Sequence, residues 1–191
     1  MNLRTVRIVM WSAVAAIVSL VVLDRAGAFG YRGDDWSRFN QKPVRAIEVI
    51  DGDTFCAELE SGEAVPVRLL GVDAPEIPDA HWSAEAKKYT EARLANRTVT
   101  LRLDGTQTRD DAGNLLAYVF ILDTDCLNVD IVRDAQAFAD RRIKHTLSSP
   151  IETAETDARK KRRGMWRELT DDQQPAWRQA WLRELQRRRN N

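Results

Sequence analysis

Cysteine and histidine are scarce in this sequence of 191 residues, which contains two of each. These four residues are scattered along the chain, so they do not form the ligand spacing of a structural zinc site. The two cysteines, Cys56 and Cys126, have no spacing that indicates a disulfide. Acidic and basic residues are equal in number, 29 of each, so the net charge gives no indication of a charged partner. The length suits one domain of about 130–160 residues with a hydrophobic core.

The N-terminal segment has the pattern of a secretory leader. Arg4 and Arg7 precede an apolar run over residues 8–23, and the small residues 26–28 follow it. The run is short for a membrane-spanning helix and long for the apolar part of a signal peptide. A cleaved signal peptide and an uncleaved signal anchor therefore both remain open for residues 1–28. Either way, we expect the folded part to lie outside the cytoplasm, as a secreted or periplasmic protein or as one anchored to the membrane.

The pattern of apolar residues predicts an α+β fold that is mainly a β barrel. Five segments have strand character, at residues 44–50, 54–60, 64–70, 98–103 and 115–122, and apolar residues alternate in the second and third of them. Helical spacing predicts a helix at 81–95, between the third and fourth strands. This order matches a five-stranded OB-type barrel. We expect a linker at 29–43, the domain at 44–167 and a C-terminal helical extension at 168–191.

Three more helices are expected after the last strand. Asn128 is placed to cap the first of them, and Ser149 the second, which Gly164 would end. The third begins near Pro175 and carries Trp177 on an apolar stripe, which is expected to pack against the barrel or the preceding helix.

Four acidic residues stand where predicted strands end. The stretch VIDGDTF (49–55) contains Asp51 and Asp53, and RLLGVDAPEI (68–77) contains Asp73 and Glu76. Clustered carboxylates repel one another unless a cation or a proton intervenes, and hard cations such as Ca²⁺ prefer carboxylate and carbonyl oxygens. Ordinary turn chemistry is the alternative interpretation, because aspartate next to glycine or before Ala-Pro is common in turns.

Arg68 stands off the apolar face of its strand and close in sequence to these acids. A guanidinium there can bind a phosphate through two parallel hydrogen bonds. It can equally form a salt bridge to one of the acids. Spacing alone does not separate the two roles.

Six stretches of the sequence, taken in order, resemble the successive blocks of the staphylococcal nuclease (thermonuclease) family. They are VIDGDTF, VRLLGVDAPEI, SAEAKKY, GNLLAYVF, LNVDIVRDAQA and AETDARKKRRGMW, and the resemblance extends over residues 44–166. It implies an OB barrel with helices. It also implies cleavage of phosphodiester bonds in DNA or RNA, assisted by one Ca²⁺ ion.

The resemblance also implies roles for individual residues. Asp53 and Asp73 match the metal carboxylates, and the backbone carbonyl of Ala74 matches a further metal ligand. Glu76 matches the acid that positions or deprotonates the attacking water. Arg68 matches one of two arginines that stabilise charge on the phosphate. Asp51 matches a position near the metal that is not counted as a direct ligand.

The chain departs from the family pattern at one catalytic position. Asn114 stands where the second arginine is expected, and Ala112 where a tyrosine is common. Loss of one such electrostatic donor typically costs about 10²–10³ in rate. Arg109, five residues earlier, is a candidate to reach over the same loop. The sequence therefore predicts a monomeric nuclease with reduced activity, or alternatively a catalytically impaired OB module that binds nucleic acid or a protein partner at the cell envelope.

Overall fold

A computed structural model of the chain describes residues 35–76, 81–95, 97–105 and 107–190. The predicted leader or anchor at residues 1–28 lies outside the described residues, so its nature and the expected location outside the cytoplasm stay predictions. Among the helices that are described, none combines the length and the apolar character needed to cross a bilayer.

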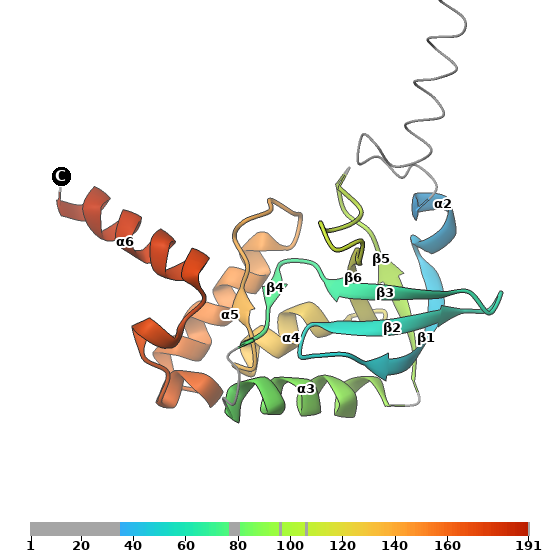
Figure 1. Cartoon of the computed structure of the whole chain (residues 1–191), viewed down its shortest axis with the longest axis horizontal. Coiled ribbons are helices and arrows are strands. Elements are labelled where there is room, and N and C mark those ends of the chain that lie inside the picture. The colour runs from blue at the N-terminus through green and yellow to red at the C-terminus, as the bar shows by residue number, and fades with distance from the viewer. Residues whose placement is uncertain (1–34, 77–80, 96, 106, 191) are drawn as a thin grey trace, which may run out of the picture.

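Five strands close into a barrel, shown at the centre and right of Figure 1. Their order is β3-β2-β1-β5-β6, and parallel pairing of β3 with β6 closes the ring. The alternation in β3 shows why these segments form strands, because Val65, Val67 and Leu69 are buried and the residues between them are not. The prediction of an OB-type barrel within an α+β fold is confirmed. The strands are β1 (Lys42–Val49), β2 (Thr54–Leu59), β3 (Ala64–Leu69), β5 (Thr98–Arg102) and β6 (Leu115–Leu122).

Helices cover the barrel and extend the molecule to one side. In Figure 1, α3 (His81–Leu94) runs along the bottom of the barrel, and α6 (Ala176–Asn190) projects away from it at the left. Helices α4 (Leu127–Arg133) and α5 (Ser148–Lys160) lie between them and pack on each other. Two short 3₁₀ turns, Gly164–Arg167 and Asp171–Gln173, connect α5 to α6.

The barrel interior and the adjoining helix faces form one continuous hydrophobic core. Burying a leucine, isoleucine or phenylalanine side chain stabilises the fold by roughly 1.5–3 kcal/mol relative to leaving it in water. The core therefore fixes the ends of the strands, where the acidic loops begin. Its largest members, each less than 2% exposed, include Phe39, Phe55, Leu69, Leu94, Leu101, Leu115, Leu127, Ile131 and Ile151.

Part of the predicted linker at 29–43 belongs to the folded domain. Residues Asp35–Phe39 form a short helix, α2, in which Phe39 is completely buried in the core. The sequence shows no sign of this helix, because the apolar residues of the segment follow neither helical nor strand spacing. Its burial depends instead on single side chains that pack against distant strands. Three two-residue strands were not predicted either, because alternation needs a longer run to be visible: β4 (Val72–Asp73), β7 (Asp125–Cys126) and β8 (Phe138–Ala139).

The predicted helix caps are wrong. Helix α4 begins at Leu127 with Cys126 at the cap position, and α5 begins at Ser148. The Asn128 side chain is instead completely buried, where it accepts a hydrogen bond from the Val119 amide and donates to two backbone carbonyls. Helix α5 ends at Lys160, before Gly164. Both cysteines are free thiols.

Candidate active site

The turn between β1 and β2 holds the first pair of acids. The Asp51 Oδ1 accepts a hydrogen bond from the Asp53 amide at 3.0 Å, so Asp51 stabilises the turn itself. Gly52 lies between them because a Cβ there would stand 2.6 Å from the Cβ of Ala86 and 2.7 Å from that of Ala74. The glycine thus lets the turn pack directly on α3 and on the second acidic loop.

Strand register places Arg68 beside Asp53. Arg68 on β3 pairs with the residue that follows Asp53 on β2, and its Nη2 lies 3.2 Å from the Asp53 Oδ2. The same oxygen accepts a hydrogen bond from the Ala74 amide at 2.7 Å, while Thr54 Oγ1 donates to the other oxygen at 2.8 Å. These contacts join the end of the first acidic loop to the second.

Asp53 is 1% exposed, and its burial dominates its ionisation. Burial raises the pKa of Asp53 to about 7, although Arg68 and the amide of Ala74 act in the opposite direction. The carboxylate therefore lacks enough positive charge around it to offset the loss of water.

Asp73 receives three side-chain donors. It forms the end of β4, and its Oδ1 is 2.8 Å from the Arg68 Nη2 and 2.7 Å from the Arg142 Nη2. Its Oδ2 accepts a hydrogen bond from the Trp177 Nε1 at 2.9 Å. The acids of the two loops thus converge on one guanidinium, that of Arg68.

Glu76 ends the described part of the second acidic loop and is exposed. Burial by itself lowers the pKa of Arg68, but the negative charges of Asp53, Asp73 and Glu76 outweigh this effect and raise the pKa. Glu76 therefore lies within electrostatic reach of Arg68, and the guanidinium remains charged.

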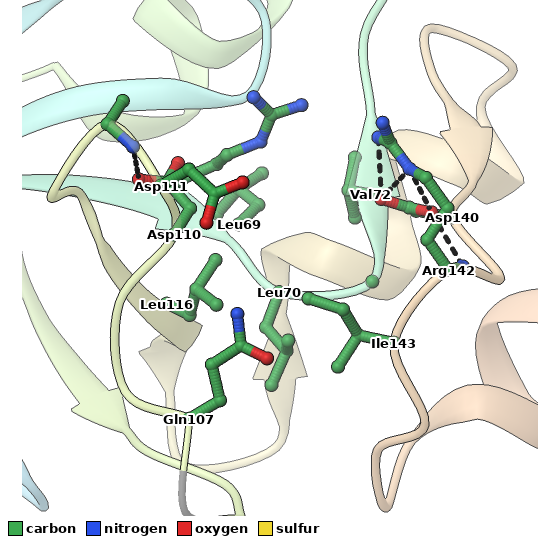
Figure 2. A pocket seen from close by; sticks show the side chains of 13 residues that line it. Leu69, Leu70, Val72, Gln107, Asp110, Asp111, Leu116, Asp140, Arg142 and Ile143 are labelled. Carbon is green, nitrogen blue, oxygen red and sulfur yellow. Dashed lines mark hydrogen bonds and ion pairs between the residues drawn. The ribbon is translucent and has the colours of Figure 1, made fainter. Parts of the chain in front are cut away.

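A pocket of about 430 Å³ opens beside Arg68. In Figure 2, Asp110 and Asp111 lie on one side of it, and Arg142, bonded to Asp140, lies on the other. The site thus combines oxygen ligands of the kind that hard cations prefer with guanidinium groups that bind anions. Other residues that line the pocket include Leu69, Leu70, Gly71, Val72, Gln107, Ala112, Leu116 and Ile143.

Two candidates from the sequence point elsewhere. The Asn114 side-chain amide donates to the Asp110 Oδ2 at 2.9 Å within its own loop. The Arg109 guanidinium forms two hydrogen bonds with Asp35, at 2.8 and 2.9 Å, and a third with the carbonyl of Gly113. Neither Asn114 nor Arg109 is among the residues that line the pocket. Asp53, Asp73 and Glu76 do not line it either, and the last two line another pocket, of about 250 Å³.

Sequence reasoning missed two residues of the site. Arg142 and Trp177 contact Asp73 from 69 and 104 positions away in the chain. Trp177 was visible as part of the apolar stripe, which indicated packing but not a hydrogen bond. Arg142 has no local signal, because neither spacing nor a motif distinguishes it from its neighbour Arg141.

Comparison with known proteins identifies relatives of this chain. The profile of the family described as "Staphylococcal nuclease homologue" matches residues 66–168. The chain is 30% identical over 159 residues to the thermonuclease of Staphylococcus hyicus, covering 80% of this chain and 92% of that protein. It is 28% identical over 177 residues to a micrococcal nuclease of Shigella flexneri, covering 88% and 91%. It is 30% identical over 135 residues to an uncharacterized endonuclease of Escherichia coli, covering 70% and 81%. The chain therefore belongs to the staphylococcal nuclease family.

Proposed function

We propose that this protein is a nuclease that hydrolyses phosphodiester bonds of DNA or RNA with the help of Ca²⁺. The observation that carries the proposal is the meeting of two buried carboxylates, Asp53 and Asp73, on the single guanidinium of Arg68. Family membership supports the same conclusion, since relatives from several bacteria are named as nucleases.

The residues at this site fit a calcium ion. Asp53, Asp73 and the carbonyl of Ala74 offer the oxygen ligands that Ca²⁺ prefers. Burial raises the pKa of Asp53, so the negative carboxylate is disfavoured at this position unless a cation stabilises it. Within the described part of the chain, no group of three or more histidine, cysteine, aspartate or glutamate side chains is arranged to hold a metal. Water and substrate would supply the remaining oxygen ligands of a bound ion. A bound Ca²⁺ would act as a Lewis acid toward the phosphate and a nearby water.

The chain's own groups supply the remaining chemistry. Glu76 is exposed and lies near Arg68, so its carboxylate can accept the proton of an attacking water. The phosphate gains negative charge as the water attacks, and the Arg68 N–H groups can donate to its oxygens. The fixed contacts of Arg68 to Asp53 and Asp73 orient the guanidinium before the substrate arrives.

The direct test is cleavage of single-stranded DNA and of RNA by the full chain. We expect cleavage in Ca²⁺ and none in chelator. Glu76→Gln should abolish cleavage, whereas Glu60→Gln, which alters an exposed acid in the turn between β2 and β3, should not. Cleavage that continues in chelator, or that survives Glu76→Gln unchanged, would refute the proposal.

A second candidate function is a binding module without efficient catalysis. The observation that favours it is the Asn114 amide, which is held by Asp110 and does not line the pocket. Under this alternative the chain would bind nucleic acid or a protein partner at the cell envelope. Binding of labelled oligonucleotides in Ca²⁺ without any cleavage would support it.

A further inference from the structure

Arg142 brings a second guanidinium to the carboxylate that Arg68 already contacts. The Nη2 atoms of both arginines lie within 2.8 Å of the same oxygen, Asp73 Oδ1. The distance between the two Nη2 atoms therefore cannot exceed the sum of these two hydrogen-bond lengths. Both arginines line the same pocket, and the Arg142 side chain is 48% exposed, so it is open to a ligand from solvent.

The surroundings of Arg142 hold it in this position. Its Nε and Nη2 donate to the two oxygens of Asp140 at 2.8–3.1 Å, as the dashed lines in Figure 2 show. Its guanidinium carbon lies 5.1 Å from the ring centre of Trp177, within cation–π distance. A long side chain fixed on two sides loses less entropy when it binds a ligand.

Of the described residues that line this pocket, Arg68 and Arg142 are those that carry a guanidinium. Arg109 is committed to Asp35, and the amide of Asn114 to Asp110. A second positive donor for a phosphate in this pocket is thus available at Arg142.

We propose that Arg142 contacts the phosphate of the nucleic acid together with Arg68 and supplies the second guanidinium that position 114 lacks. The inference rests on the proposed function, because it names a further catalytic residue of the same site. A phosphodiester offers several oxygens to both arginines, whereas in the free protein both share one oxygen of Asp73. Asp73 would also hold its two arginines less tightly if its charge were shared with a cation.

The test compares Arg142→Gln with Arg142→Lys and with a control, Arg45→Gln. Arg45 is 64% exposed, pairs with Glu58 across two strands and does not line the pocket, so its loss removes one charge without touching the site. Two readouts are needed. The first is the single-turnover cleavage rate of a single-stranded oligonucleotide at saturating Ca²⁺. The second is the affinity for the same fluorescent oligonucleotide in chelator, measured by anisotropy over a series of salt concentrations.

We expect Arg142→Gln to lower the rate about 10²–10³-fold, a loss that persists at saturating Ca²⁺. In chelator, its slope of log affinity against log salt should be shallower by about 0.7, the value for one phosphate contact on a single strand. Arg142→Lys should retain the salt slope, because the positive charge remains. Its cleavage rate should fall, because lysine lacks the planar guanidinium that forms two parallel hydrogen bonds. Arg45→Gln should match the wild type in rate and slope.

The proposal is overturned if Arg142→Gln keeps the wild-type salt slope. It is also overturned if additional Ca²⁺ restores its rate, because Arg142 would then act only by orienting Asp73. Absence of cleavage by the wild type would refute the proposed function instead, and the salt slopes in chelator would still decide whether Arg142 contacts phosphate. Thermal unfolding of each variant, followed by circular dichroism, checks that the fold is intact.

Discussion

Asp53→Asn is the substitution whose effect follows most directly from the structure. The folded protein binds a proton at Asp53 with a pKa of about 7, against an ordinary value of 3.8. Asparagine can replace the protonated acid with little rearrangement. Its carbonyl oxygen can face the Ala74 amide and Arg68, and its amino group can donate to the hydroxyl of Thr54. In the variant the buried charge is gone, and the hydrogen bonds remain.

The magnitude depends on pH and has a definite sign. Because the pKa is raised on folding, the folded state takes up the proton more readily than the unfolded state, and this contribution to stability is lost as pH rises from 3.8 to about 7. Each pH unit in that range is worth about 1.4 kcal/mol. In chelator, the stability of Asp53→Asn relative to wild type should therefore increase by roughly 3 kcal/mol between pH 5 and pH 8.

Urea unfolding at pH 5 and pH 8 in chelator measures this difference, and Asp123→Asn, at an exposed turn, serves as the control. The comparison with wild type cancels the titration of the groups that do not interact with Asp53. Addition of Ca²⁺ at about 100 times its dissociation constant should stabilise the wild type by roughly 2.7 kcal/mol and the variant much less. Identical pH dependence of wild type and Asp53→Asn would show that burial does not raise this pKa and would refute the reasoning.

Three further substitutions test other parts of the molecule. Gly52→Ala forces a methyl to 2.6 Å from the Cβ of Ala86, and such overpacking should cost about 1–3 kcal/mol of unfolding free energy in urea. Trp177→Phe keeps the ring but removes the N–H bonded to Asp73, so calorimetry should show Ca²⁺ affinity about 10–100-fold weaker, and unchanged affinity would contradict the role of that bond. Asn128→Ala removes three hydrogen bonds to buried backbone groups and should destabilise the fold by about 2–4 kcal/mol, whereas a loss below 1 kcal/mol would contradict the network.

The sequence predicted the barrel because each strand carries a local apolar pattern, which alternates in β3 and is nearly continuous in β6. In β3, Val65, Val67 and Leu69 show the period within six residues, and the acids follow directly where the strand signal stops. The meeting of Asp53 and Asp73 was implied by the family resemblance, in which both match metal carboxylates. It did not require knowledge of any single long-range contact.

Contacts between distant segments were not predictable in the same way. Asn128 has the residue type and the place of a helix cap, but its amide is taken by the carbonyls of Leu70 and Ala117 on the barrel. The asparagine side chain can accept and donate hydrogen bonds equally well as a helix cap or as a buried link to the barrel. The packing of α4 on β6 decides between the two roles. Asp35 and Arg109 show the same limit, since their ion pair joins residues 74 positions apart.

The C-terminal extension belongs to the site, although it lies beyond residue 168, where the family profile ends. Arg178 is completely buried, and its Nη1 lies 2.7 Å from the Glu155 carboxylate of α5. A buried pair of this kind is costly to break, because removing one partner leaves the other charge without compensation. The pair of Arg178 and Glu155 thus holds the start of α6 in place. Trp177, the residue before Arg178, donates its indole N–H to Asp73. Since Trp177 also lies against Arg142, the first turn of α6 fixes both a carboxylate and a guanidinium of the site. The first turn of α6 is therefore better understood as part of the candidate site than as an appendage to the barrel.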